Sequence, residues 1–207
     1  MRIKLSVPVI ILISWVMLSF AGPLLLPVHP GEVHLERRLE APSGDFLCGT
    51  DELGRDLLSR IILGSRLSLR LTAVCMALSL LLGGLLGSLA GFLGGFADMA
   101  ISRLVEVLLA LPGILLAILI LAFFRRGEYA LVLALTATSW VGYARTSRAL
   151  AMQLKKENFV QVSRLCGAGF PFVYRNHLMP NIFPVLSAQA AVGAASIIMA
   201  ESGLSFL

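Results

Sequence analysis

Charged and apolar residues are unevenly distributed along the chain. An apolar helix needs roughly 20 residues to cross the hydrocarbon core of a bilayer. Five stretches contain no Asp, Glu, Lys or Arg: 5–28, 71–97, 107–124, 129–144 and 176–200. The first, second and fifth reach that length alone, whereas the other two need flanking residues. Because hydrocarbon offers the backbone no hydrogen-bond partners, the pattern predicts five membrane-spanning helices.

The composition supports this prediction. Hydrophobic residues make up 57% of the 207 residues and charged residues only 14%. A soluble domain of this length has no means of burying so much apolar surface. We therefore expect one all-α integral membrane domain over residues 1–207. The net charge of +5 does not indicate nucleic-acid binding, because the Lys and Arg residues lie at span ends rather than in a basic run interleaved with aromatics.

The basic residues also predict the topology. Arg2 and Lys4 place the N-terminus in the cytoplasm by the positive-inside rule. The apolar run that follows is longer than the 7–15 residues or so of a secretory signal, so we interpret it as a retained span rather than a cleaved leader. The segment 29–66 then lies outside, as does the short hairpin with Arg125 and Arg126, which breaks the rule.

Four crossings bring the segment 145–181 to the cytoplasm. Its charge agrees with that side, because it contains Arg145, Arg148, Lys155, Lys156, Arg164 and Arg175.

Glycines recur every fourth residue in the second span, at Gly83, Gly87, Gly91 and Gly95. This spacing stacks them on one helix face. We expect close packing against a neighbouring helix, in this chain or in a partner subunit. In the third span, Pro112-Gly113 predicts a kink, which is either a bend that lines a path or a tolerated irregularity.

The three cysteines carry no recognisable chemistry. Cys48, Cys75 and Cys166 are far apart and odd in number, so they predict neither a metal pair nor a disulfide framework. We interpret them as small buried or interfacial residues.

The outer segment contains a helix signal at 49–62. Thr50 or Asp51 is suited to cap a helix whose leucines and isoleucines share one face. Asp56 and Arg60 are four residues apart and positioned to pair. The pattern predicts an amphipathic helix on the outer membrane surface. No His, Ser or metal-ligand pattern accompanies its carboxylates, so we expect no catalytic residue and no metal site.

The cytoplasmic segment 159–181 predicts a helix, a turn and a second helix. Gly167 and Gly169 supply the turn, Pro171 suits the first turn of the next helix, and Asn181 is a candidate cap for the fifth span. A helical hairpin with apolar and aromatic faces and basic flanks is typical of a plug for a partner's groove. The alternative is a loop on lipid headgroups.

This cytoplasmic segment resembles the coupling loop of ABC importer permeases, whose pattern is E-A-A, three residues, G, nine residues, then I-x-L-P. Gly167 and Pro180 agree in spacing, whereas the Glu and both Ala are replaced. The resemblance implies an ATPase-coupling role for Gln161, Ser163, Arg164, Gly167, Ala168, Gly169, Arg175, His177 and Pro180.

Two further motifs resemble the second permease of peptide and nickel importers. One is the external signature with Gly49, Thr50, Asp51, Glu52, Gly54, Arg55, Asp56 and Arg60. The other is 201–207, which is similar to the E-x-x-L-S-F-L-G-L-G segment after the fifth span. The family has six spans, so the resemblance implies a permease helical bundle with five of six spans present.

The resemblance also implies the partners and the location. A second permease, two cytoplasmic ATPase subunits and an external solute-binding protein complete such importers in the bacterial cytoplasmic (inner) membrane. ATP and Mg²⁺ belong to the ATPases, so this subunit is expected to hold no cofactor, and it has no G-x-x-x-x-G-K-[ST] loop. Within the family, 140–145, Arg148 and 163–169 look more like nickel permeases, with short peptides as the alternative solute.

Two other classes of function fit less well. A secondary transporter needs carboxylates within the membrane, and Asp98, Glu106 and Glu201 all lie near predicted span ends. An intramembrane enzyme needs a nucleophile and base or a metal constellation, but the three histidines lie at or beyond span ends.

Overall fold

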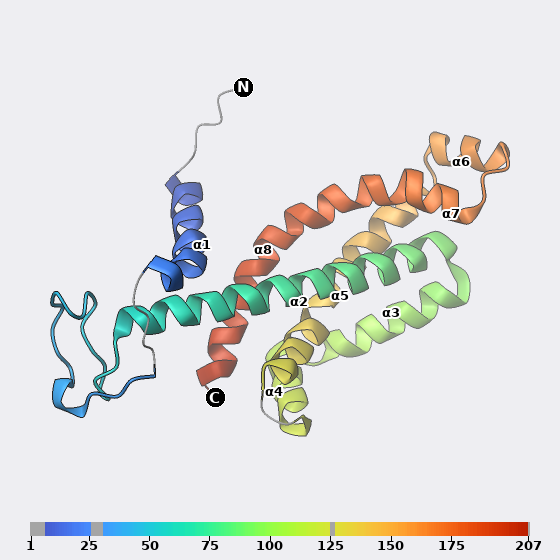
Figure 1. Cartoon of the computed structure of the whole chain (residues 1–207). Helices are drawn as coiled ribbons and strands as arrows, with labels where there is room; N and C mark the ends of the chain where they lie inside the picture. Colours follow the sequence, from blue (N-terminus) through green and yellow to red (C-terminus); the bar gives the residue numbers. More distant parts are fainter. Residues whose placement is uncertain (1–6, 26–30, 125–126, 207) are drawn as a thin grey trace. The chain divides into compact units, whose positions relative to one another are not determined.

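The computed structural model describes residues 7–25, 31–124 and 127–206. These residues are overwhelmingly helical and contain no strand; an isolated bridge joins Thr50 to Asp56. The chain divides into two compact units, residues 1–70 and 71–207, with the boundary inside one long helix. Figure 1 shows the elements of each unit.

Unit 1 contains α1 (Val7–Leu25), the 3₁₀ helix η1 (Leu35–Arg37) and the first part of α2 (Leu57–Leu93). The indole nitrogen of Trp15 donates to the Ser65 hydroxyl at 3.2 Å, and Gly22 lies against Ile62. These contacts pack α1 on the first turns of α2. The predicted first span is therefore helical, whereas Arg2, Lys4 and His29 lie outside the described residues.

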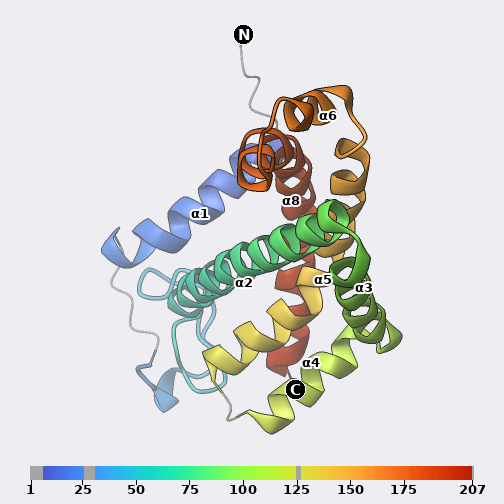
Figure 2. The ribbon, with the colours of Figure 1, turned by 90° about the vertical axis from the view of Figure 1, so that its right-hand side faces the viewer.

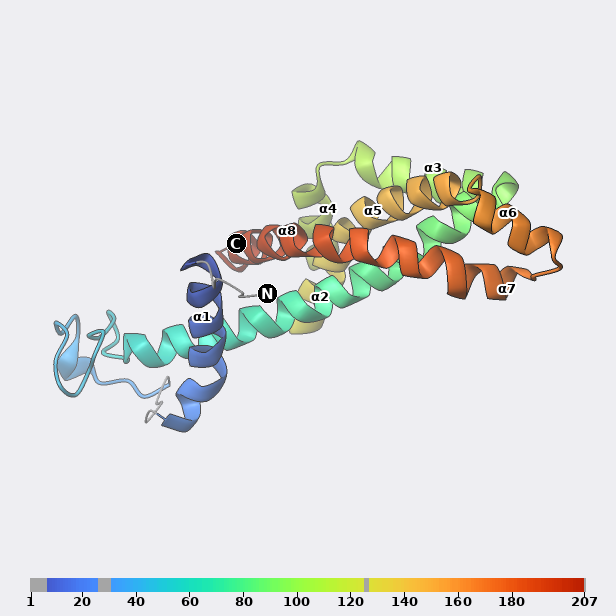
Figure 3. The same cartoon turned by 90° about the horizontal axis from the view of Figure 1, so that it is seen from above.

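Unit 2 contains the rest of α2 and the elements α3 (Gly95–Ala110), α4 (Gly113–Phe123), α5 (Glu128–Leu154), α6 (Asn158–Leu165), α7 (Phe170–Val173), the π-helical turn η2 (Tyr174–Leu178) and α8 (Met179–Phe206). Figures 1 and 3 place α6 and α7 at the same end of this unit as the turn between α2 and α3. Arg125 and Arg126, in the predicted outer hairpin, lie outside the described residues.

The predicted glycine stripe packs α2 directly on α5. A Cβ atom at Gly83, Gly87 or Gly91 would lie only 2.5, 2.1 or 2.3 Å from a backbone oxygen of α5. The neighbouring helix is thus part of this chain. The prediction that Gly95 is part of this packing is wrong. Gly95 begins α3 with φ +57°, and no atom lies within 4 Å of the place where its Cβ would be. The chain turns at 94–95, so the stripe ends before Gly95.

Each of the five apolar stretches contains helix. Among residues 7–25, 31–124 and 127–206, two helices are long and apolar enough to cross a membrane, Leu57–Leu93 and Phe170–Ser205. The third stretch is broken. The helices α3 and α4 are bent by 92° relative to one another at the break formed by Leu111 and Pro112. Figure 2 shows the change of direction between the two helices. The kink predicted at Pro112-Gly113 is confirmed and is far sharper than a bend within one helix, because Leu111 and Pro112 both have extended backbone.

Three predicted boundaries are wrong. The helix of the outer segment begins at Leu57 and continues into the second span, so it is no separate surface helix. The helix α5 continues to Leu154, ten residues into the predicted loop. Asn181 caps nothing, because it lies within α8 and its amide donates to the carbonyl of His177 at 2.6 Å.

A widened turn explains the last of these errors. Pro180 has no N–H to donate to the carbonyl four residues earlier. The N–H of Met179 bonds to the carbonyl of Tyr174, five residues back, which makes η2 a π turn. The helix therefore continues through the proline rather than beginning after it.

Candidate functional site

The turn between α6 and α7 is the clearest candidate for a docking element. The helix α6 ends in a Schellman motif, in which Ala168 N–H bonds to the carbonyl of Ser163 and Gly167 N–H to that of Arg164, both at 3.0 Å. This motif needs a left-handed residue, and Gly167 has φ +86°. Gly169 then leads into α7, where Pro171 occupies the first turn. The predicted turn and the second helix are confirmed.

Buried side chains fix this coupling segment, residues 155–181, to the rest of unit 2. Val160, Val173, Leu178 and Ile182 are fully buried in one cluster with Phe92 of α2. The ring of Phe170 lies 5.4 Å from that of Phe92, and the hydroxyls of Tyr174 and Ser88 are 2.9 Å apart. The segment is therefore packed against α2 as well as continuous with α8.

His177 connects the two halves of the segment. Its Nε2 lies 3.2 Å from the hydroxyl of Ser163, and its ring packs 5.6 Å from Phe159 and 5.9 Å from Phe172. Gln161 donates to the carbonyl of Lys156 at 2.9 Å. His177 thus joins the two halves of the hairpin, whereas the bond of Gln161 stays within the first half.

The outer surface of the segment combines basic and apolar side chains. Its exposed residues include Val162, Arg164, Leu165, Cys166, Phe172, Arg175 and Pro180. Leu165 is 87% exposed, which is costly for a leucine that stays in water. An exposed surface of this kind, on a rigid base, is suited to a partner's groove.

The external signature forms a tight turn in unit 1. The Thr50 hydroxyl is buried; it donates to the carbonyl of Arg37 and accepts from the N–H of Glu40 at 2.8 Å. Gly49 and Gly54 both have positive φ, and a Cβ at either would overlap a backbone carbonyl oxygen. Both signature glycines are therefore required by backbone geometry.

Asp51 organises the charges of this turn. Hydrogen bonds to its carboxylate hold the pKa of Asp51 well below its usual range. The largest effect comes from the N–H of Arg55, followed by the guanidinium of Arg55, the N–H of Leu53 and the guanidinium of Arg60. The predicted pair of Asp56 with Arg60 is wrong, since Arg60 turns to Asp51 at 2.5 Å. Asp56 instead caps α2, accepting from the N–H groups of Leu58 and Ser59. Glu52 is exposed, and its carbonyl accepts from Arg38 at 2.7 Å.

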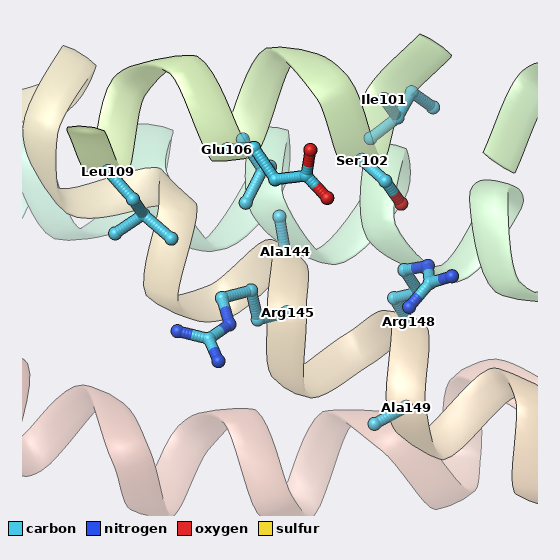
Figure 4. Close-up of a pocket in the computed structure, with 9 residues that line it drawn as sticks. Ile101, Ser102, Glu106, Leu109, Ala144, Arg145, Arg148 and Ala149 are labelled. Carbon is cyan, nitrogen blue, oxygen red and sulfur yellow. The ribbon is translucent and has the colours of Figure 1, made fainter. Parts of the chain in front are cut away.

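The sequence analysis missed a charged cavity between α3 and α5. It measures about 420 Å³ and is lined by Ile101, Ser102, Val105, Glu106, Leu109, Ala144, Arg145, Arg148 and Ala149 (Figure 4). At its edge Arg148 makes a two-pronged ion pair with Asp98, with Nη2 2.7 Å from Oδ2. The available signal was the presence of acidic residues in α3, at Asp98 and Glu106, and of arginines in α5, at Arg145 and Arg148.

Glu201 is buried in the last part of α8, five residues before Phe206, with 7% of its surface exposed. It lies near Cys75, and its Oε2 has no hydrogen-bond partner among residues 7–25, 31–124 and 127–206. In the same described ranges, no three His, Cys, Asp or Glu side chains gather closely enough to hold a metal ion.

Comparison with known proteins identifies the family. The model of the "Binding-protein-dependent transport system inner membrane component" family matches residues 83–207. The dipeptide permease DppC of Bacillus subtilis (strain 168) is 35% identical over 197 residues, covering 95% of this chain and 62% of the relative. The nickel permease NikC of Escherichia coli (strain K12) is 32% identical over 205 residues, covering 99% and 73%.

A third relative has the highest identity of the three. The di/tripeptide permease DppC of Pseudomonas aeruginosa (strain UCBPP-PA14) is 38% identical over 192 residues, covering 90% of this chain and 63% of the relative. The chain thus spans somewhat less than two thirds of the length of both DppC relatives named here. The chain belongs to the family of inner membrane components of binding-protein-dependent transport systems.

Proposed function

We propose that this chain is a permease subunit of an ATP-driven ABC importer and forms part of the path by which a small solute enters the cell. Family membership supports the general role. The observation that carries the proposal is the coupling segment, a helical hairpin that is held rigidly at its base and exposed on its outer face.

The coupling segment is built to transmit motion. In our proposal, cytoplasmic ATPase subunits bind its exposed residues, among them Arg164, Leu165 and Arg175. Closure of the ATPases on ATP moves the segment as a body, and its buried contacts move α2 and α8 with it. This subunit supplies part of the path and the coupling segment that moves with the ATPases, whereas ATP and Mg²⁺ are bound by the ATPases.

The remaining partners and the topology follow from the same proposal. A second permease completes the path, and an external solute-binding protein delivers the solute. The N-terminus and the coupling segment lie in the cytoplasm, and the turn around Thr50 lies outside. The helices α1, α2, α3 with α4, α5, and α8 then correspond to five spans of the bundle.

Two solutes are candidates. Resemblance of 140–145, Arg148 and 163–169 to nickel permeases favours nickel or a nickel chelate. The names of the relatives include dipeptide, di/tripeptide and nickel transport, which supports short peptides at least as well.

Recruitment of the ATPases tests the proposed role. Membranes carrying this chain and its second permease are incubated with the purified ATPase subunits, and the bound ATPase is quantified after sedimentation. The variants are Leu165→Glu, which places a carboxylate in the exposed apolar surface, and Leu63→Glu, which introduces the same charge at a less exposed leucine of unit 1.

We expect Leu165→Glu to reduce the bound ATPase at least about tenfold, because an apolar anchor is replaced by a hydrated charge. Leu63→Glu is expected to bind as much ATPase as the unchanged chain. Equal ATPase recruitment by both variants would refute docking on this surface.

A further inference from the structure

The cavity between α3 and α5 contains one positive charge that is not paired with any residue of the described part of the chain. Arg148 is paired with Asp98, and Glu106 is paired with Arg103 at 2.9 Å. Arg145 lines the same cavity, and none of the described residues forms an ion pair or hydrogen bond with its guanidinium. The group thus carries a net single positive charge, located on Arg145.

Arg145 is central to this hollow face of α5. A second hollow, of about 480 Å³, adjoins the first and is lined by Gly142, Arg145, Thr146, Ala149 and Leu150. The two hollows share Arg145 and Ala149. Gly142 and Ala149 are exposed and small, so they leave room around the guanidinium. Figure 4 shows Arg145 and Arg148 of α5 facing the same cavity as Glu106 and Ser102 of α3.

The opposite face of α5 is fully occupied. Tyr143, Ser147 and Ala151 are buried there against the glycine stripe of α2. The exposed face therefore has to meet lipid, a partner subunit or water. An unpaired guanidinium within a membrane span is costly in lipid, and such residues face a bundle interior or a water-filled cavity. Arg145 lies nine residues before the end of α5, about 14 Å along the helix at 1.5 Å per residue.

We propose that this hollow face is part of the wall of the translocation path, and that Arg145 binds the carboxylate of the solute as it passes. Guanidinium groups match carboxylates with two parallel hydrogen bonds. The cavity volume falls in the range of small-molecule sites, roughly 300–1,000 Å³. Arg148 is paired with Asp98 and Glu106 with Arg103, so the rest of the site is neutral. The single positive charge of Arg145 therefore balances one carboxylate of the solute.

The inference rests on the proposed import function and deepens it by naming the chemical group of the solute. A carboxylate is present at the C-terminus of a short peptide and in a nickel complex with an organic acid. Both kinds of solute offer a carboxylate to Arg145. The solutes compared in the experiment distinguish a peptide from a nickel complex.

The experiment uses the complete importer, with the second permease, ATPases and binding protein, in vesicles supplied with ATP. Uptake is measured for labelled dialanine, its C-terminal amide, the bare nickel ion, and nickel with citrate. The variants are Arg145→Gln, Arg145→Lys, and Arg66→Gln as a control for the loss of an exposed arginine in unit 1.

We expect Arg145→Gln to lower uptake of the carboxylate solute at least about tenfold, since a hydrogen bond to a charged group is lost. The amide should be affected less than about twofold, Arg145→Lys should retain part of the uptake, and Arg66→Gln should retain all of it. If the binding protein does not deliver the amide, reaction of an Ala149→Cys variant, which keeps Arg145, with a charged thiol reagent replaces that arm, in a background with Cys48 and Cys166 changed to serine. Dialanine or nickel citrate is then expected to slow labelling at least about fivefold, the amide not at all.

Three results would overturn the inference. The first is import of the bare nickel ion and of no other solute. The second is an equal loss of uptake for dialanine and its amide in Arg145→Gln, which would point to a contact between Arg145 and the second permease. The third is unchanged uptake by Arg145→Gln. Absence of ATP-driven uptake by the unchanged importer would instead count against the proposed function.

Discussion

Replacing Gly87 by alanine would place a methyl group against the backbone of α5. The added carbon would lie 2.1 Å from the carbonyl oxygen of Ala144 and 2.2 Å from the hydroxyl of Ser147. Real contacts of this kind need about 3.4 Å, so the helices would have to separate by roughly 1.3 Å. A backbone atom has no rotamer with which to avoid the clash.

The expected loss of stability follows from that displacement. Overpacking a close contact typically costs about 1–3 kcal/mol, and the rigidity of the backbone here favours the upper end. Moving α2 also weakens the bond from the Ser147 hydroxyl to the carbonyl of Gly83, now 2.8 Å, by about 0.6 kcal/mol or more. We therefore expect Gly87→Ala to destabilise the chain by about 3 kcal/mol.

Gly64→Ala is the matched control, because Gly64 lies in the same helix with no atom near its missing Cβ. Alanine in an open helical position is expected to be neutral or to stabilise by about 1 kcal/mol. The assay heats the detergent-purified protein in steps and measures the fraction that stays monodisperse in gel filtration. Equal midpoints for the two variants would refute the close packing of α2 on α5.

Three other predictions concern the coupling segment and the external turn. Gly167→Val is expected to leave the protein in the membrane but to abolish solute uptake, because a β-branched residue resists the φ of +86°; uptake at the normal rate would contradict the role of the turn. Glu52→Cys, in a background with Cys48 and Cys166 changed to serine, is expected to react with an impermeant maleimide in intact cells, and labelling only after lysis would invert the topology. Asp51→Asn is expected to speed amide hydrogen exchange over 49–56 at neutral pH, because the ionised Asp51 stabilises the folded turn. The pKa of Asp51 is lowered in the folded protein, so this stabilisation is complete above the pKa of the unfolded chain, about 4, and is lost as the pH falls below that value. The two proteins should converge in strongly acidic solution; a difference that persists there would argue against the ion pairs.

Apolar periodicity and turn chemistry predicted the helices and the turn at Gly167 well. Five charge-free stretches are enough to locate five helical regions, and Gly167 with Pro171 is a local signal that needs no tertiary information. Helix ends were predicted less accurately. At Thr50 the local pattern favours a helix cap, but the hydroxyl of Thr50 donates to the loop before it, at the carbonyl of Arg37. The carboxylate of Asp51 accepts from the turn after it, at Leu53 and Arg55, rather than from the first turn of a helix.

Contacts between distant residues explain what the sequence did not reveal. Asp98 and Arg148 are 50 positions apart, and only the packing of α3 on α5 makes them a pair. The same packing leaves Arg145 without a partner and creates the cavity. Pro180 was interpreted as a helix boundary, whereas a π turn absorbs its missing donor.

ATP-driven uptake is the measurement that tests the central claim most directly. The complete importer is assembled in vesicles with ATP on the side of the coupling segment, and accumulation of labelled dialanine and of nickel is followed with and without the binding protein. If the chain is a permease of this kind, one of these solutes accumulates only when both ATP and the binding protein are present, and Gly167→Val abolishes the accumulation. Accumulation of the solute without ATP, or without the binding protein, would contradict the account.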